Sequence, residues 1–164
     1  MGVVLRAAVL GDLSAIFDIY HEQVLHGIAT FDTQIKTEDE QHAWLASHQV
    51  EYPAIVAVIE GGLIVGWATL SPWSPRRAYD RTAEVSTYVH KDHRGRGVGS
   101  MMLADIIGRA TNTGRKVLLA RIAEPNPASV KLYESAGFWT VGMMRGVGEK
   151  FGRVLDVRMM QREI

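Results

Sequence analysis

The sequence predicts a mixed α/β fold in which helices pack against a central β-sheet. Three observations lead to this prediction. Short segments rich in β-branched residues alternate with segments whose apolar residues recur at helical spacing. Glycine and proline occur mainly where these segments join. The chain has 164 residues, 47% of them hydrophobic and 22% charged, so we expect residues 1–164 to form a single domain with a substantial core.

In chain order, we predict a strand over residues 3–7, helices over 13–25 and 37–49, strands over 54–59, 63–70 and 82–90, a helix over 97–113, a strand over 116–122, a helix over 126–136, and strands over 138–147 and 153–160. Asp12 is a candidate cap for the first helix. Thr37 and Glu40 have the spacing of a capping box, which starts the second helix. The Gly61-Gly62 pair favours a hairpin turn between two strands.

The third predicted helix follows a loop in which Gly95, Gly97 and Gly99 alternate. The start of a helix carries backbone amides without partners and the positive end of the helix dipole. Glycine lets this backbone approach an anion, and Arg94 and Arg96 add charge suited to phosphate oxygens. The loop is therefore typical of a phosphate-binding site, although a tight strand-to-helix turn with solvated arginines would give the same pattern.

Two common phosphate motifs do not fit this loop. No lysine follows the glycines as a P-loop requires, and the spacing is Gly-x-Gly-x-Gly and not the Gly-x-Gly-x-x-Gly of dinucleotide-binding folds.

The segment Arg94-Gly95-Arg96-Gly97-Val98-Gly99 instead resembles the Arg/Gln-x-x-Gly-x-Gly/Ala signature of the GNAT N-acetyltransferase superfamily. Residues 126–138 are similar to the second cofactor segment of that family, Asn-x-x-Ser-x-x-Leu-Tyr-x-x-x-Gly-Phe. The order of elements agrees over essentially the whole chain. The resemblance implies a GNAT fold, with a mixed central sheet splayed in the middle and helices on both faces, and it implies acetyl-CoA as co-substrate. The cofactor-binding residues expected from these segments are Tyr88, Val89, His90, Arg94, Gly95, Arg96, Gly97, Val98, Gly99, Ser100, Asn126 and Ser129.

A narrower resemblance concerns the phosphinothricin and methionine sulfoximine or sulfone acetyltransferases, which acetylate the α-amino group of small, glutamate-like amino acid analogues. It rests on Thr30-Phe31, Pro72-Trp73, Ala78-Tyr79, Thr82-Ala83-Glu84, Tyr88-Val89, Lys150-Phe151-Gly152 and Asp156. The resemblance implies an N-acetyltransferase for a small amine or amino acid. The alternatives are an acetyltransferase for a protein N-terminus or a polyamine, and a non-catalytic acyl-CoA-binding module.

Acetyl transfer to an amine requires a base for the amine and an acid for the departing thiolate. Glu84 is the candidate base, since it is the carboxylate of an otherwise neutral strand and shares a face with Ser86 and Tyr88. A carboxylate at this strand end could also pair with Arg81 or be solvated. Tyr133 matches the position of the family's general acid, although the phosphinothricin subgroup often has His there and a core role would also explain a tyrosine. The chain has no cysteine, so we expect direct attack in a ternary complex and no acetyl-cysteine intermediate.

Aromatic and basic residues are the candidates for acceptor binding, because an amino acid carboxylate favours arginine and a small ligand favours rigid aromatic walls. These candidates are Phe31, Trp73, Arg76, Arg77, Tyr79 and Lys150. Each charged member of this set could equally be an ordinary surface charge.

Composition limits the other partners. Lysine plus arginine equals aspartate plus glutamate at 18 each, so we expect neither nucleic acid nor a membrane as partner. No histidine cluster has ligand spacing, and we expect no metal. No signal-like segment occurs near the first residues, and the absence of cysteine suits the cytoplasm. Homodimers are common among the proteins that the sequence resembles, which makes a homodimer our expectation.

Overall fold

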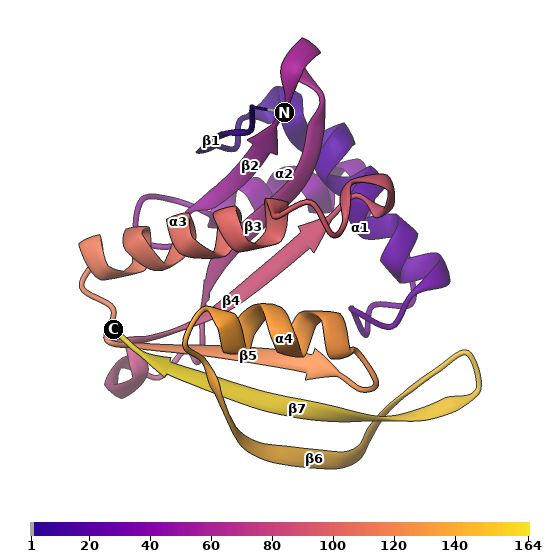
Figure 1. Cartoon of the computed structure of the whole chain (residues 1–164), viewed down its shortest axis with the longest axis vertical. Helices are drawn as coiled ribbons and strands as arrows, with labels where there is room; N and C mark the ends of the chain where they lie inside the picture. Colours follow the sequence, from indigo (N-terminus) through magenta and orange to yellow (C-terminus); the bar gives the residue numbers. More distant parts are fainter. Residues whose placement is uncertain (1) are drawn as a thin grey trace.

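The computed structural model describes residues 2–164 and contains one seven-stranded sheet, with strand order β1-β2-β3-β4-β5-β7-β6 (Figure 1). The strands are β1 (Val4–Ala7), β2 (Ala54–Val58), β3 (Ile64–Pro72), β4 (Thr82–Val89), β5 (Val117–Ala123), β6 (Trp139–Lys150) and β7 (Arg153–Glu163). The helices are α1 (Leu13–His26), α2 (Glu38–Ser47), α3 (Val98–Asn112) and α4 (Pro127–Ser135). The predicted order of elements is confirmed.

The sheet opens between β4 and β5, its one parallel pair of strands. These strands pair over three positions, from Thr82 opposite Val117 to Glu84 opposite Leu119. On its other side, β4 stays paired with β3 as far as Val89. The backbone of β4 beyond Glu84 therefore lacks a strand neighbour on the β5 side, which confirms the predicted splay (Figure 1).

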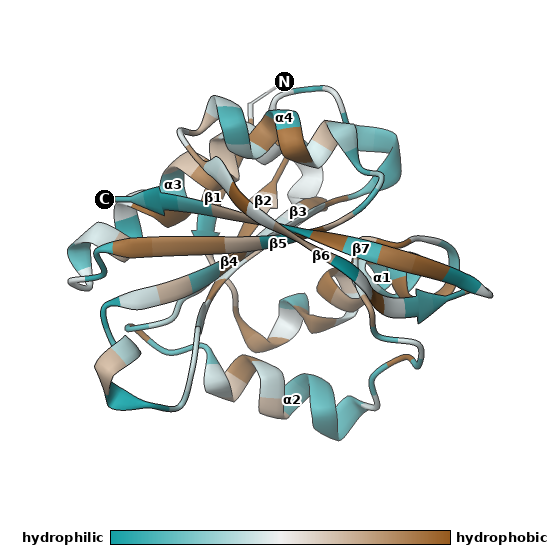
Figure 2. Cartoon of the chain, turned by 90° about the horizontal axis from the view of Figure 1, so that it is seen from below, coloured by the Kyte–Doolittle hydropathy of each residue, from teal (hydrophilic) through white to brown (hydrophobic). Residues whose placement is uncertain are grey.

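The helices cover both faces of the sheet, as predicted. Figure 2 shows α3 and α4 on one side of the sheet and α1 and α2 on the other. Ile16 and Phe17 of α1 pack with Trp67 of β3, whereas Met102 and Ile106 of α3 belong to the larger core on the opposite face. Within residues 2–164, no helix has both the length and the apolar character required to cross a membrane.

Asp12 does not cap α1 as predicted. Its side chain makes no capping hydrogen bond, and its carboxylate instead accepts hydrogen bonds from the Arg6 guanidinium at 2.6 and 2.8 Å and from the Val9 amide at 2.8 Å. The Arg6 hydrogen bond lowers the pKa of Asp12. The capping box of α2 is confirmed: the Thr37 amide donates to Glu40 Oε2 and the Glu40 amide donates to Thr37 Oγ1.

Strand β6 continues to Lys150, beyond the predicted end at residue 147. The glycines of β6 lie beside irregularities in its pairing with β7 and do not end the strand. The register shifts between Thr140 and Gly142 and again between Met144 and Gly148. Pairing with β7 then resumes at Gly148 and carries the strand to Lys150. This extra length brings β6 against the loop that follows α1.

Candidate active site

The glycine loop joins β4 to α3 and adopts backbone conformations that only glycine tolerates well. Gly95 and Gly97 have φ angles of 71° and 82°, in the left-handed region. No atom lies within 4 Å of a Cβ built on either residue, so the positive φ, and not crowding, explains both glycines. The Met101 amide donates to Gly97 O at 3.1 Å, so the amides of Val98, Gly99 and Ser100 precede the first intrahelical hydrogen bond of α3. The loop thus presents a row of free donors at a helix start.

A groove of about 490 Å³ runs from this loop along α4 on the α3/α4 face. Its walls contain the predicted residues Tyr88, Val89, Arg94, Gly95, Gly97, Val98, Gly99, Ser100, Asn126 and Ser129. The predicted residues Arg96 and His90 lie outside these walls, and His90 Nδ1 accepts a hydrogen bond from the Asp92 amide. We call this cavity the glycine-loop groove.

Two residues of the groove have structural partners of their own. The Arg94 guanidinium folds back and donates from Nε to Val89 O at 3.1 Å. Asn126 Oδ1 accepts a hydrogen bond from the Ser129 amide at 3.1 Å and so caps α4. Arg94 Nη2 also pairs with Glu22 Oε2 of α1 at 3.4 Å, and the arginine side chain remains 50% exposed at the mouth of the groove.

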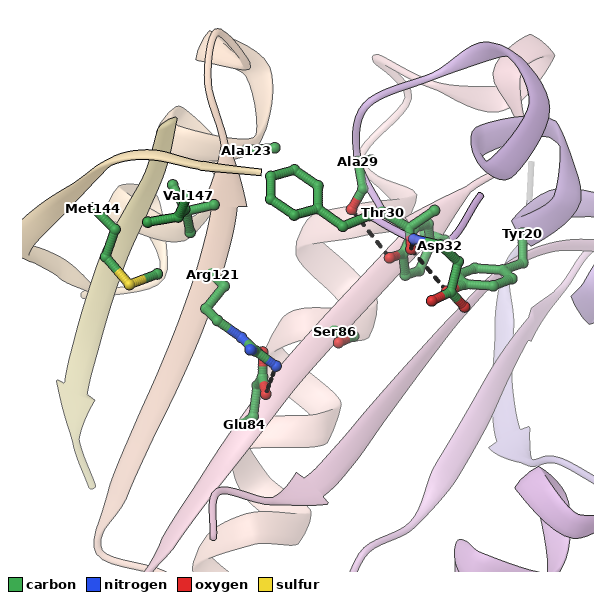
Figure 3. Close-up of a pocket in the computed structure, with 13 residues that line it drawn as sticks. Tyr20, Ala29, Thr30, Asp32, Glu84, Ser86, Arg121, Ala123, Met144 and Val147 are labelled. Carbon is green, nitrogen blue, oxygen red and sulfur yellow. Dashed lines mark hydrogen bonds and ion pairs between the residues drawn. The ribbon is translucent and has the colours of Figure 1, made fainter. Parts of the chain in front are cut away.

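A second cavity, also of about 490 Å³, lies on the opposite face of the sheet (Figure 3). It is lined by Tyr20, Ala29, Thr30, Phe31, Asp32, Glu84, Ser86, Tyr88, Arg121, Ala123, Met144, Val147 and Val157. Glu84, Ser86 and Tyr88 share this face, as the alternation of β4 predicts, while Thr87 and Val89 line the glycine-loop groove. We call it the Glu84 cavity.

Glu84 forms an ion pair with Arg121 of β5, and not with Arg81. The guanidinium donates from Nε to Oε1 and from Nη2 to Oε2, both at 2.7 Å, across the opening of the sheet (Figure 3). The hydrogen bonds to Glu84 raise the pKa of Arg121. Sequence reasoning missed Arg121, whose signal is a lone charged residue in the otherwise apolar strand β5.

Tyr133 lies between the two cavities. It is 4% exposed and lines a small space of about 40 Å³ together with Asn126, Ser129 and residues of β4. Its hydroxyl donates to Val85 O at 3.3 Å and lies 3.2 Å from Thr87 Oγ1. Burial raises the pKa of Tyr133 to about 12. The phenol is therefore neutral at physiological pH and retains its proton.

The loop after α1 forms one wall of the Glu84 cavity. Tyr20, which sequence reasoning also missed, places its hydroxyl 2.8 Å from Thr30 Oγ1 and donates to Asp32 Oδ2 at 2.7 Å. Phe31 lies over Gly148, where an added Cβ would collide with the ring. The closeness of this contact explains why β6 carries a glycine at that position.

Lys150 ties the same loop to the end of β6. It is 4% exposed, and its Nζ donates to Gln23 O and to Thr30 O, both at 2.8 Å. Burial lowers the pKa of this amine. Lys150 is thus a buried crosslink beneath the wall, outside the residues that line the cavity.

The remaining predicted acceptor residues follow β3. The Arg121 guanidinium lies 5.7 Å from the centre of the Trp73 ring. Arg76, Arg77 and Tyr79 occupy an exposed turn outside the lining of either cavity. Over residues 2–164, no three His, Cys, Asp or Glu side chains are arranged to hold a metal ion.

Comparison with known proteins agrees with this geometry. The model of a family described as an acetyltransferase (GNAT) domain matches residues 5–159. The L-amino acid N-acyltransferase MnaT of Escherichia coli (strain K12) is 36% identical over 161 residues, which cover 98% of this chain and 93% of that protein. The L-methionine sulfoximine/L-methionine sulfone acetyltransferase of Salmonella typhimurium is also 36% identical, over 98% of this chain and 94% of its own length.

Among solved structures, a GNAT superfamily phosphinothricin acetyltransferase from Sinorhizobium meliloti, in complex with AcCoA, superposes with a TM-score of 0.96. It is 36% identical in sequence, and the match covers 100% of this chain and 89% of that one. The family match, these full-length relatives and the shared fold lead to one conclusion: the chain belongs to the GNAT family of acetyltransferases.

Proposed function

We propose that this protein transfers the acetyl group of acetyl-CoA to the α-amino group of a small amino acid analogue of the phosphinothricin, methionine sulfoximine or methionine sulfone type. The observation that carries the proposal is the pair of cavities on opposite faces of the sheet, with the small space around Tyr133 sharing lining residues with each of them. The acceptor class follows the activities named for the relatives. In this proposal, the glycine-loop groove takes acetyl-CoA and the Glu84 cavity takes the acceptor.

The glycine-loop groove fits acetyl-CoA in charge and shape. The free amides at the start of α3, with Arg94 beside them, suit the pyrophosphate. Thr87 faces the opening of the sheet between Val85 and Val89, so its backbone groups are available to an extended pantetheine arm, as if to an added strand. Arg96, Ser100 and His90 remain proposed contacts for the outer phosphates.

Acetyl-CoA supplies an acetyl group activated as a thioester. In the proposed mechanism, Glu84 accepts a proton from the acceptor ammonium and leaves a neutral amine whose lone pair attacks the thioester carbon. A C–N bond forms and the C–S bond breaks. The Tyr133 hydroxyl donates a proton to the departing sulfur, and the second proton that the nitrogen gives up as the amide forms returns through solvent to the Tyr133 oxygen, which restores the hydroxyl. The chain has no cysteine to carry the acetyl group, which favours direct attack in a ternary complex.

The acceptor would lie between the loop after α1 and strand β4. Phe31 supplies an apolar wall held by Gly148, and Lys150 fixes the loop that carries it. The Trp73 ring, whose centre lies 5.7 Å from the Arg121 guanidinium, is a further proposed contact of the acceptor. Arg76, Arg77 and Tyr79 lie on the exposed turn that follows Trp73. We propose these three residues as secondary contacts of the acceptor.

We also propose that residues 1–164 act as one domain, in the cytoplasm, as a homodimer. Strand β6 is an edge of the sheet and exposes apolar side chains, with Trp139 46%, Val141 50% and Val147 52% exposed. Covering such a row with a second copy would remove it from water.

The test of the proposed function is an acceptor screen that measures release of the CoA thiol. We expect turnover of acetyl-CoA with phosphinothricin, methionine sulfoximine and methionine sulfone, and at least about 10-fold lower kcat/KM with polyamines and with peptides that have free N-termini. A preference for peptides or polyamines would contradict the acceptor class. No turnover with any amine, by folded protein that binds acetyl-CoA, would favour a non-catalytic module.

The glycine-loop groove can be tested with Gly99→Val. A Cβ on Gly99 would lie 3.2 Å from Leu132 Cδ2 and 3.7 Å from Val89 Cγ2, so the larger side chain pushes α3 from α4 at the floor of the groove. We expect the Kd for acetyl-CoA, measured by calorimetry, to rise about 10-fold or more and the protein to lose about 1–3 kcal/mol of stability. Gly108→Val is the matched control, because this glycine lies on the same helix with no atom within 4 Å of an added Cβ. An equal loss of affinity in both variants would contradict the assignment of the groove.

A further inference from the structure

We propose that Arg121 recognises the carboxylate of the acceptor and thereby releases Glu84 to act as base, so that the enzyme selects amines that carry a carboxylate. This inference rests on the proposed function and adds a specificity residue to it. Its starting point is that the candidate base is already engaged: both oxygens of Glu84 accept hydrogen bonds from Arg121 at 2.7 Å. An amine that enters the Glu84 cavity meets a carboxylate whose charge is neutralised and each of whose oxygens already accepts a hydrogen bond from Arg121.

The ion pair spans the opening of the sheet. Glu84 is on β4 at the last position that pairs with β5, and Arg121 is on β5, two residues beyond its last pairing with β4. The pair therefore lies in the Glu84 cavity at the opening of the sheet (Figure 3), and Arg121 also lines the small space around Tyr133. A ligand that separates Glu84 from Arg121 changes the site at the place where the amine must meet the thioester.

Arg121 is suited to exchanging its partner. The side chain is 54% exposed, whereas that of Glu84 is 14% exposed, so the guanidinium can turn toward the cavity while the carboxylate stays in place. Apart from Glu84, the Arg121 guanidinium has no hydrogen-bond acceptor within the described part of the chain. A substrate carboxylate offers the same two-oxygen geometry that Glu84 provides, so the exchange replaces one bidentate pair by another.

The other cations near the Glu84 cavity are less suited to this task. Lys150 is buried and donates to two backbone carbonyls, and Lys36 pairs with Asp32 at 3.1 Å. Arg76 and Arg77 lie outside the cavity lining. Among the residues that line the cavity, Arg121 carries the one cationic side chain. An amino acid with its carboxylate on Arg121 would direct its ammonium group toward the released Glu84.

The kinetic test compares methionine sulfone with the amine that remains when this compound loses its carboxyl group. For the wild-type enzyme, we expect a kcat/KM at least about 100-fold higher for the amino acid. Arg121→Gln should reduce the amino acid kcat/KM about 30-fold or more, chiefly through KM, and should leave or raise that of the simple amine, because Glu84 is then permanently free. Arg121→Lys should restore part of the preference for the amino acid, since lysine keeps the positive charge but cannot make the two parallel hydrogen bonds of a guanidinium. Arg109→Gln, which removes an arginine–aspartate pair on α3, is the matched control.

A binding test does not depend on turnover. Its probe is the acid that remains when methionine sulfone loses its amino group, titrated by calorimetry into the wild type, Arg121→Gln, Glu84→Gln and the double variant. The acid must displace Glu84 from Arg121, so we expect Glu84→Gln to bind it about 10-fold more tightly than the wild type. Arg121→Gln should abolish binding, and the double variant should resemble Arg121→Gln.

The outcomes separate the two proposals. If the wild type acetylates methionine sulfone and Arg121→Gln keeps the full preference over the simple amine, the role of Arg121 is overturned while the proposed function stands. The role of Arg121 is also overturned if Arg76→Gln or Arg77→Gln, and not Arg121→Gln, abolishes binding of the acid. If no acceptor is turned over but the acid binds with the predicted variant pattern, the proposed function fails and the carboxylate site at Arg121 stands.

Discussion

Replacing Glu84 with glutamine will lower kcat about 100- to 10,000-fold for every accepted amine, while the Kd for acetyl-CoA stays unchanged. Glutamine keeps the size of the side chain and its packing against β5 but cannot accept a proton from the ammonium. The loss should therefore fall on kcat, and KM for an amino acid should not rise, since the substitution also frees Arg121. Steady-state kinetics at saturating acetyl-CoA, with calorimetry for the Kd, measure both quantities.

The control for this variant is Glu124→Gln. Glu124 also pairs with an arginine, at 2.5 Å from Arg158, but lies outside the lining of both cavities. We expect its kcat within about 3-fold of the wild type. If Glu84→Gln behaves in the same way as this control, Glu84 is not the base.

Replacing Tyr133 with phenylalanine should reduce kcat about 100-fold or more, with little change in KM for the acceptor. The variant retains the ring that packs at 5.0 Å on Phe138 and loses the hydroxyl near Thr87 and Val85. The cost in stability should be only about 1 kcal/mol, which thermal unfolding can measure.

The pH dependence separates this role from a structural one. A group whose pKa is raised to about 12 keeps its proton at all pH values below that, so Tyr133 should produce no alkaline loss of activity between about pH 6 and 9. The Tyr133→Phe defect should be constant over this range. A thioester donor with a more acidic thiol needs less protonation of its leaving group and should rescue the variant. A defect that persists unchanged with such a donor would point to packing as the role of Tyr133.

Local patterns in the sequence predicted those parts of the site that depend on neighbouring residues. The glycine loop could be predicted because its features lie within a few positions of each other. These features are the positive φ angles of Gly95 and Gly97 and the start of α3. The face that Glu84 shares with Ser86 and Tyr88 follows from strand alternation alone. The predicted cap at Asp12 was wrong because the carboxylate binds the Arg6 guanidinium, six residues earlier on β1, and the Val9 amide instead of the amides of α1.

Contacts between distant segments could not be read from the sequence. Arg121 and Glu84 are 37 residues apart, and their meeting depends on the register of β4 and β5. The burial of Lys150 depends on the loop after α1, which is 120 residues away from it at Thr30. A charged residue in a sequence carries no signal of whether it will be solvated, as expected for many lysines, or enclosed.

The walls of the two cavities come from different parts of the chain. The glycine-loop groove is built mainly by α3, α4 and the loop before α3, whereas the Glu84 cavity is built mainly by the loop after α1 and by β5, β6 and β7. Strand β4 lines both cavities, and Ala29 and Tyr88 are common to them. Under the proposed assignment of the two cavities, substitutions that reshape the acceptor side can therefore accumulate with little effect on the donor side. Because the two sets of wall residues are largely separate, the fold can keep one acetyl donor while the amine it accepts changes during evolution.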